Sequence, residues 1–180
     1  MLIVCIGGAR SGKSTFALDL ARRHHDTTGG GVTFVATSPR LDDDADLITR
    51  IEAHRAERPA TWTTIEETVD LADALGRCGG DFVVVDCVTL WVNNLMWRGD
   101  ADTDVVRAAT QTAALAAGRD ATTVVVTNEV GSGVHPTTDV GRRYRDLLGH
   151  VNQVWTAAAD RALLLVAGRA LDLHEPGGLL

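Results

Sequence analysis

The feature that most constrains the fold of this chain is a glycine-rich loop near its start. Residues 7–14 read GGARSGKS and match the pattern G-x-x-x-x-G-K-[ST]. The apolar run LIVCI at 2–6 precedes the loop, and a pattern of helical spacing follows it from Phe16 onward. A strand, a glycine loop and a helix in this order predict a phosphate-binding loop, because this is the setting in which such a loop works.

The residue types of the loop explain how it would hold phosphate. Successive backbone N–H groups converge on phosphate oxygens, and the positive end of the following helix adds to the attraction. Gly7 and Gly12 allow backbone conformations and close approaches that a side chain would block. We expect Lys13 to reach the β- and γ-phosphates and Ser14 to offer its hydroxyl to Mg²⁺. The nucleotide-binding residues predicted from the loop are Gly7, Gly8, Ala9, Arg10, Ser11, Gly12, Lys13 and Ser14.

The other apolar runs predict the fold class. Further β-branched runs lie at 32–36, 82–87, 123–127 and 163–166, and most are continuously apolar, as strands covered on both faces are. Helical stretches lie between them at 13–25, 45–57, 66–77, 88–98, 103–118 and 140–159. Strands that alternate with helices predict an α/β fold with a mostly parallel sheet and helices on both of its faces.

Length and composition limit the classes of protein to consider. With 180 residues, of which 45% are hydrophobic and 23% charged, the chain suits one globular domain, which we place at 1–173 with a frayed tail at 174–180. The net charge of −7 disfavours a nucleic-acid partner, and no run approaches the ~20 apolar residues of a membrane span. Cys5, Cys78 and Cys87 form no C-x-x-C pair, which favours free thiols in a reducing cytoplasm.

A carboxylate at the end of an apolar run is the predicted metal ligand. Asp86 follows the run FVVV at 82–85. In P-loop proteins this position holds Mg²⁺, directly or through water, and oxygen ligands suit this hard cation. Taken alone, Asp86 would fit a strand-end cap or a turn residue better, and it is the neighbouring phosphate-binding loop that favours the metal role. Thr89 and Asn93 follow on the next helical stretch, where they could contact phosphate or substrate or simply cap helix ends.

Two arginines flank one histidine at helical spacing. Arg50, His54 and Arg58 recur at intervals of four residues and therefore share one side of a helix. Nearby positive charge lowers the pKa of a histidine, so we expect a neutral imidazole here, and a neutral imidazole is a nucleophile for phosphorus. The guanidinium groups could hold the phosphates under attack. The same spacing also fits a solvated helix face on which Glu52 and Glu57 form ion pairs.

A polar and glycine-rich segment follows the fourth apolar run. Residues 127–136 read TNEVGSGVHP, and they follow a strand at the edge where open parallel sheets bind ligands. Asn128 and Glu129 are candidates to contact the substrate or to hydrogen-bond to a ligand of the metal, and Glu129 is also a candidate base. The glycines suggest a movable lid, but a loop that merely turns the chain is an equal alternative.

Together these segments resemble one family, the bifunctional adenosylcobinamide kinases/adenosylcobinamide-phosphate guanylyltransferases of cobalamin biosynthesis. The matching segments are GGARSGKS at 7–14, VATS at 35–38, the pattern H-x-x-x-R-P-x-x-W at 54–62, DCVT at 86–89, NNL at 93–95, TNEVGSG at 127–133 and RRYRDLLGHVNQ at 142–153. They cover most of the chain in the expected order. The histidine segment and TNEVG are far more specific than the phosphate-binding loop.

The resemblance implies a single-domain, RecA-like P-loop NTPase fold and two reactions. In the first, the γ-phosphoryl group of ATP or GTP moves to the aminopropanol hydroxyl of adenosylcobinamide. In the second, GMP from GTP moves through a guanylylated histidine, which corresponds to His54, onto the new phosphate of adenosylcobinamide phosphate. The products are adenosylcobinamide-GDP and pyrophosphate. The resemblance also implies Mg²⁺ as cofactor and a homo-oligomer, notably a trimer.

The resemblance further implies the residues that contact GTP and catalyse the reactions. His54 and Lys13 are the expected catalytic residues, and Ser14 and Asp86 are the expected metal ligands. Arg50 is a candidate for a substrate contact from its spacing to His54, not from the resemblance. Beyond 7–14, the implied GTP contacts are Ala36, Thr37, Ser38, Arg55, Ala56, Glu57, Arg58, Glu66 and Asp86. Two other functions also fit the phosphate-binding loop: a small-molecule kinase without guanylylation, and a non-catalytic nucleotide-dependent switch.

Overall fold

A mostly parallel sheet organises the chain, of which this computed structural model describes residues 1–39 and 55–179. Its strands within those residues are β1 (Leu2–Gly7), β2 (Val32–Ala36), β3 (Thr63–Glu66), β4 (Phe82–Asp86), β5 (Thr122–Asn128), β6 (Arg161–Val166) and β7 (Arg169–Leu173). They lie in the order β3-β2-β4-β5-β1-β6-β7, and only β6 and β7 pair antiparallel. Strand β5 therefore separates β1, which leads into the phosphate-binding loop, from β4, which ends in Asp86.

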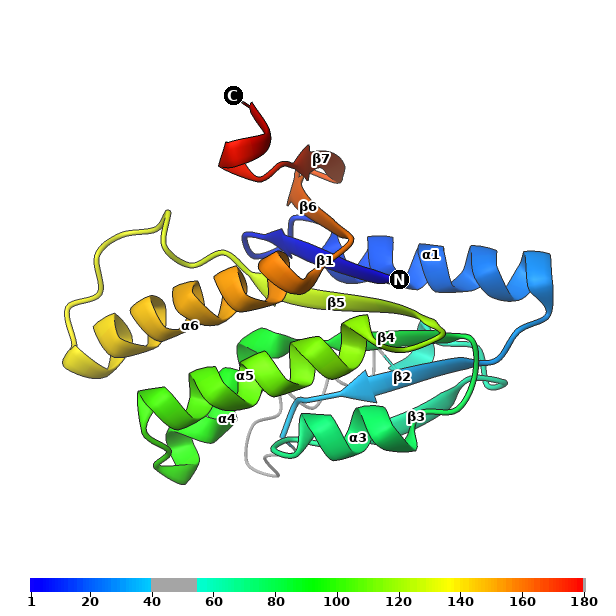
Figure 1. The fold of residues 1–180 in the computed structure, drawn as a ribbon, viewed down its shortest axis with the longest axis horizontal. Coiled ribbons are helices and arrows are strands. Elements are labelled where there is room, and N and C mark those ends of the chain that lie inside the picture. Colours follow the sequence, from blue (N-terminus) through cyan, green and yellow to red (C-terminus); the bar gives the residue numbers. More distant parts are fainter. Residues whose placement is uncertain (40–54, 180) are drawn as a thin grey trace.

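Helices cover both faces of this sheet (Figure 1). Helix α1 (Lys13–Thr28) lies on one face, and α3 (Leu71–Arg77), α4 (Val88–Arg98), α5 (Asp102–Ala117) and α6 (Asp139–Ala158) lie on the other. A short 3₁₀ helix, η1 (Pro176–Leu179), follows β7. The arrangement confirms the predicted α/β class with helices on both faces. None of the described helices combines the length and the apolar composition that crossing a membrane requires.

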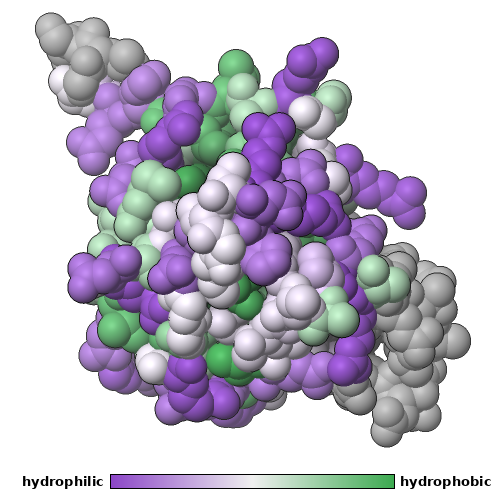
Figure 2. All heavy atoms as spheres, turned by 90° about the vertical axis from the view of Figure 1, so that its right-hand side faces the viewer, coloured by the Kyte–Doolittle hydropathy of each residue, from purple (hydrophilic) through white to green (hydrophobic). Residues whose placement is uncertain are grey.

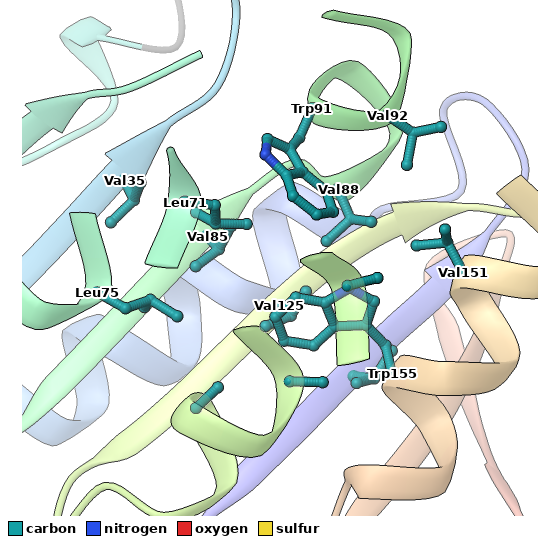
Figure 3. Close-up of a cluster of buried hydrophobic side chains, with 14 of the residues drawn as sticks. Val35, Leu71, Leu75, Val85, Val88, Trp91, Val92, Val125, Val151 and Trp155 are labelled. Atoms are coloured by element: carbon teal, nitrogen blue, oxygen red, sulfur yellow. The ribbon is translucent and has the colours of Figure 1, made fainter. Parts of the chain in front are cut away.

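Two hydrophobic cores lie against the two faces of the sheet, because successive side chains of a strand point to opposite faces. Leu2 and Val4 of β1 join the core under α3 to α6, whereas Ile3 and Cys5 join the core under α1. Figure 3 shows the larger core, in which tryptophans of α4 and α6 pack over valines of the central strands. Burial on both faces explains why these strands read as continuous apolar runs.

The two strands that the sequence does not predict lie at the edges of the sheet. Strand β3 is mostly exposed, and every residue of β7 is exposed, so neither carries the apolar run of a buried strand. The predicted helix at 66–77 is also wrong at its start, because Glu66 ends β3 and α3 begins at Leu71. The carboxylate of Asp70 caps that helix by accepting from the backbone N–H of Asp73 at 2.9 Å.

The direction of the strands decides where a ligand can bind. The carboxyl ends of the parallel strands lie together at the left of Figure 1, where the loop after β1 enters α1. Figure 2 shows the opposite end, at the amino ends of the strands, where hydrophilic and intermediate side chains cover most of the surface and hydrophobic ones form small separate areas. Ligands of open parallel sheets bind at the carboxyl ends of the strands.

Candidate nucleotide-binding site

A cavity of about 510 Å³ opens at the carboxyl ends of the central strands. Its walls come from the phosphate-binding loop, from the ends of β2, β4 and β5, and from the start of α4. The cavity brings together many of the residues that the sequence predicts: Ala9, Arg10, Ser11, Gly12, Lys13, Ser14, Ala36, Ser38, Arg58, Asp86, Thr89 and Asn128. Phe34, Cys87 and Leu90 also line it, although no feature of the sequence predicts them as site residues.

The conformation of the loop depends on its glycines. Gly12 has a φ of 96°, which an L-residue with a side chain rarely adopts, and it caps the start of α1. A Cβ on Gly7 would lie 2.3 Å from the carbonyl oxygen of Leu165, so β6 passes too close for any side chain there. The turn between β6 and β7 also supports the loop, because the N–H of Gly168 donates to the carbonyl oxygen of Ser11 at 2.9 Å.

Lys13 is folded onto its own loop. Its Nζ donates to the carbonyl oxygen of Gly8 at 2.6 Å and lies 3.4 Å from the hydroxyl of Ser11. Only 7% of the residue is exposed. Burial lowers the pKa of Lys13 because it disfavours the ammonium form, while the nearby Asp86 carboxylate acts in the opposite direction. Among the residues that the structure describes, the ammonium of Lys13 is therefore held near the cavity by a neutral carbonyl oxygen, with the Asp86 carboxylate nearby.

Ser14 and Asp86 carry the oxygen atoms that suit a divalent cation. Ser14 lies in the first turn of α1 and Asp86 at the end of β4, and both half-buried side chains line the cavity. Within the described ranges, no group of three or more His, Cys, Asp and Glu side chains could hold a metal by itself. This donor set fits Mg²⁺, which proteins usually bind through one or two side chains together with the phosphates of a substrate.

The segment that follows the candidate histidine contacts both α1 and β2. Arg58 places its guanidinium 4.3 Å from the ring centroid of Phe34 and lines the cavity. Arg22 of α1 donates to the backbone carbonyl of Glu57 at 2.5 Å. Burial lowers the pKa of Arg58, and the charge of Arg55 acts in the same direction. These contacts set the position of residues 57 and 58 beside the site.

Other predicted residues lie around the cavity or outside the described ranges. His54 and Arg50 fall outside the residues that the structure describes. Arg55, Ala56, Glu57 and Glu66 are exposed and do not line the cavity. Thr37 is fully buried, and its hydroxyl accepts from the N–H of Cys87 and donates to the carbonyl oxygen of Cys87, both at 2.7 Å. Thr37 therefore ties the end of β2 to the end of β4 rather than lining the cavity.

The two asparagines of α4 differ in their contacts. The side chain of Asn94 donates to the carbonyl oxygens of Thr37 and Thr68, at 2.8 and 3.0 Å. The predicted residue, Asn93, is half-buried and does not line the cavity. The segment NNL at 93–95 matches the family, but the sequence alone predicts a site role for Asn93 and not for Asn94, because the packing of the helix decides which of the two side chains reaches Thr37.

Glu129 binds its own loop. Its two carboxylate oxygens accept from the backbone N–H groups of Gly131 and Ser132, at 2.7 and 3.0 Å. Partial burial raises the pKa of Glu129, but the hydrogen bonds from Ser132 and Gly131 outweigh burial and hold it below its usual value. Glu129 does not line the cavity. Its contacts shape the loop after β5, whereas its neighbour Asn128 lines the cavity.

Comparisons with known proteins agree on one family. A sequence model of the family described as cobinamide kinase / cobinamide phosphate guanyltransferase matches residues 3–173. The bifunctional adenosylcobalamin biosynthesis protein CobU of Escherichia coli K12 is 37% identical, over 93% of this chain and 97% of that protein. CobP of Pseudomonas aeruginosa, which bears the same description, is 38% identical over 95% of this chain and 96% of that protein.

A solved structure shows the same fold at much lower identity. The KaiC-like protein PH0186 of Pyrococcus horikoshii OT3 superposes with a TM-score of 0.53 over 91% of this chain and 69% of that one, at 15% identity. This likeness concerns the fold alone, a mostly parallel sheet with helices on both faces. The match over residues 3–173 and the two bacterial relatives show the family. The chain belongs to the cobinamide kinase / cobinamide phosphate guanyltransferase family.

Proposed function

We propose that this chain phosphorylates adenosylcobinamide with ATP or GTP and then transfers GMP from GTP onto the new phosphate. The observation that carries the proposal is the cavity in which Lys13, Asp86 and Arg58 meet at the carboxyl ends of the strands. A lysine, a carboxylate and an arginine around a glycine loop suit a nucleoside triphosphate with its metal ion. Membership of the family supplies the substrate class.

In the kinase step, the aminopropanol hydroxyl oxygen forms a bond to the γ-phosphorus. The bond between that phosphorus and the bridging oxygen breaks, its electron pair stays on the nucleoside diphosphate, and the hydroxyl proton passes to the medium. Lys13 would leave the carbonyl of Gly8 and bind the β- and γ-phosphates. Ser14 and Asp86 would hold Mg²⁺, which neutralises phosphate charge when bound.

In the guanylyl step, an imidazole nitrogen of His54 forms a bond to the α-phosphorus of GTP and pyrophosphate leaves. The phosphate of adenosylcobinamide phosphate then attacks the same phosphorus and releases the imidazole, so one difficult transfer becomes two easier ones. The position of Arg58 on the cavity wall supports this role for the segment, because Arg58 lies four residues after His54. The two steps act on different phosphorus atoms, so we infer that the nucleotide shifts between them.

The same proposal includes the oligomeric state of the protein and the cellular compartment in which it works. We infer a homo-oligomer, as a trimer, in the cytoplasm, with no nucleic-acid partner. The free and buried thiols of Cys5, Cys78 and Cys87 suit a reducing compartment, and burial raises the pKa of Cys5 to about 12, so this thiol stays protonated. The net charge of −7 disfavours nucleic acid. Light scattering after size-exclusion chromatography measures the oligomeric state.

Labelling with α-³²P-GTP tests the guanylyl step. We expect acid-labile, base-stable label on the wild-type chain, no label on His54→Ala, and normal label on His174→Ala, which removes an exposed histidine near the end of the chain. His54→Ala should still phosphorylate adenosylcobinamide, as mass spectrometry would show. A wild-type chain that takes no label but makes the phosphorylated product would be a kinase alone. Nucleotide turnover that ignores adenosylcobinamide would favour a switch.

A further inference from the structure

We propose that the carboxamide of Asn128 binds the γ-phosphoryl group during its transfer, and that Thr89 and Asn152 are positioning residues that hold Asn128. The inference rests on the proposed kinase step. It assigns a catalytic contact to the end of β5. It also gives a role to the buried hydrogen bonds around Asn128, which involve neither the phosphate-binding loop nor the expected metal ligands.

The order of the strands places Asn128 between the two halves of the site. Strand β5 lies between β1 and β4, so its carboxyl end opens between the phosphate-binding loop and Asp86. In the strand register, Asn128 is opposite Gly7, and Val126 is opposite Asp86. Asn128 is half-buried and lines the cavity, and within the described ranges no hydrogen bond is recorded for its side chain. A carboxamide in this position has donors available for a ligand.

The backbone of Asn128 is held from both sides by side chains of two helices. Its N–H donates to the hydroxyl oxygen of Thr89, on α4, at 2.6 Å. Its carbonyl oxygen accepts from the amide nitrogen of Asn152, on α6, at 2.9 Å. The amide oxygen of Asn152 accepts in turn from the hydroxyl of Thr127 at 2.7 Å. The N–H and the carbonyl oxygen of Asn128 are therefore both held in place by side chains of the packed helices.

The network is buried, and it holds the backbone of a residue that lines the cavity. Thr89 is 5% exposed, Thr127 fully buried and Asn152 7% exposed. Apolar side chains at positions 89 and 152 would leave the N–H and the carbonyl oxygen of Asn128 without these partners, so the network fixes this end of β5 in one position. Asn152 does not line the cavity, so it would act on a ligand only through Asn128. The contact between β5 and the loop is also direct, because the N–H of Glu129 donates to the carbonyl oxygen of Gly7 at 3.0 Å.

The chemistry of the kinase step explains why a carboxamide there would help. As the bond between the γ-phosphorus and the bridging oxygen breaks, charge spreads over the three outer oxygens of the γ-phosphoryl group. A fixed N–H donor that meets these oxygens stabilises the transition state more than the ground state. The guanylyl step breaks a bond at the α-phosphorus instead, so Asn128 should contribute little to the labelling of His54. The two reactions of one protein thus provide an internal control.

Variants of the contact residue test the first half of the proposal. Asn128→Ala should slow phosphorylation of adenosylcobinamide at saturating substrates by ~10²-fold, the usual loss on removing one such donor. The dissociation constant of the nucleotide and the rate of His54 labelling should stay within about threefold. Equal loss of both reactions, or unchanged phosphorylation, would overturn the proposal. A wild-type chain that makes no phosphorylated product would overturn the proposed function as well.

Variants of the supporting residues test the second half. Asn152→Ala should lower kcat of the kinase step by about tenfold and leave KM for the nucleotide unchanged, whereas Gln153→Ala, at the next and exposed position of α6, should change neither. Thr89→Val should reproduce the loss, and Thr89→Ser, which keeps the hydroxyl, should restore kcat. Loss in Thr89→Ser equal to that in Thr89→Val would overturn the positioning role. Thermal melting of each variant separates these effects from unfolding.

Discussion

Nζ of Lys13 lies 2.6 Å from the carbonyl oxygen of Gly8, so the lysine that is expected to bind phosphate closes over the loop that carries it. Only 7% of Lys13 is exposed, and burial lowers its pKa. The ammonium has therefore lost much of its hydration before any ligand arrives. A triphosphate would give this cation a charged partner in exchange for a neutral carbonyl.

Replacing Lys13 should separate ligand binding from stability. Lys13→Met should weaken binding of a nucleoside triphosphate by roughly 10- to 100-fold, because hydrogen bonds to charged groups contribute about 1.5–3 kcal/mol. The melting temperature of the ligand-free chain should not fall, since the substitution removes a partly desolvated charge. Calorimetry and thermal melting measure the two effects, with Arg23→Met, an exposed change on the same helix, as control. Unchanged affinity in Lys13→Met would contradict the assignment.

Two neighbouring glycines of the loop should respond differently to the same change. A Cβ on Gly7 would lie 2.3 Å from the backbone oxygen of Leu165, whereas a Cβ on Gly8 would meet no atom within 4 Å. Gly7→Ala should therefore destabilise the chain by about 1–3 kcal/mol, the range for overpacking, and Gly8→Ala by less than about 1 kcal/mol. Urea unfolding measures both. Equal effects of the two alanines would show that β6 does not pack against the loop as described.

The sequence predicts the central strands and misses the edges for one physical reason. Burial on both faces selects apolar residues at positions 2–6 of β1 and 82–85 of β4, and such runs are visible in a single sequence. Strand β7 pairs only with β6 and is exposed throughout, so it has no hydrophobic pattern to detect. Helix α3 begins at Leu71 because Asp70 caps it, and the predicted helix wrongly includes Glu66, which ends the short strand β3.

The candidate site is predictable where a motif fixes the backbone. Residues 9–14 of the loop, Asp86 and Asn128 line one cavity, because the carboxyl ends of neighbouring parallel strands lie at the same edge of the sheet. The partners of Asn152 and Asn94 are not predictable, because each side chain reaches a carbonyl group more than twenty positions away in the chain. His54, the residue that the proposed guanylyl step needs most, lies outside the described ranges, so its role stays a prediction.

The loop after β5 should lose order in acid. Glu129 accepts hydrogen bonds from Gly131 and Ser132, and these hold its pKa below the usual 4.5. A carboxyl whose pKa is lower in the folded state stabilises the fold above its unfolded pKa, and this contribution disappears as the pH falls through the folded value. We therefore expect hydrogen exchange of the Gly131 and Ser132 amides to quicken, relative to its intrinsic rate, below pH 4.5.

Glu129→Gln tests this assignment at neutral pH. The carboxamide keeps one acceptor oxygen, so exchange of the two amides should quicken by about fivefold, equivalent to ~1 kcal/mol for a partly exposed hydrogen bond. The acid dependence below pH 4.5 should disappear in this variant. Glu175→Gln, at an exposed position near the end of the chain, should leave both amides unchanged. Persistence of the acid dependence in Glu129→Gln would assign it to another group.

Two tryptophans should differ most in their contribution to stability. Trp155 of α6 is fully buried in the core of Figure 3, whereas Trp97 of α4 is 82% exposed. Trp155→Ala should lower the free energy of unfolding by about 3–5 kcal/mol, because the cavity it leaves adds to the lost burial. Trp97→Ala should change it by less than about 0.5 kcal/mol in the monomer. Denaturant unfolding at low protein concentration measures both values. A large loss in Trp97→Ala that grows with protein concentration would instead show that Trp97 is covered by a second copy of the chain.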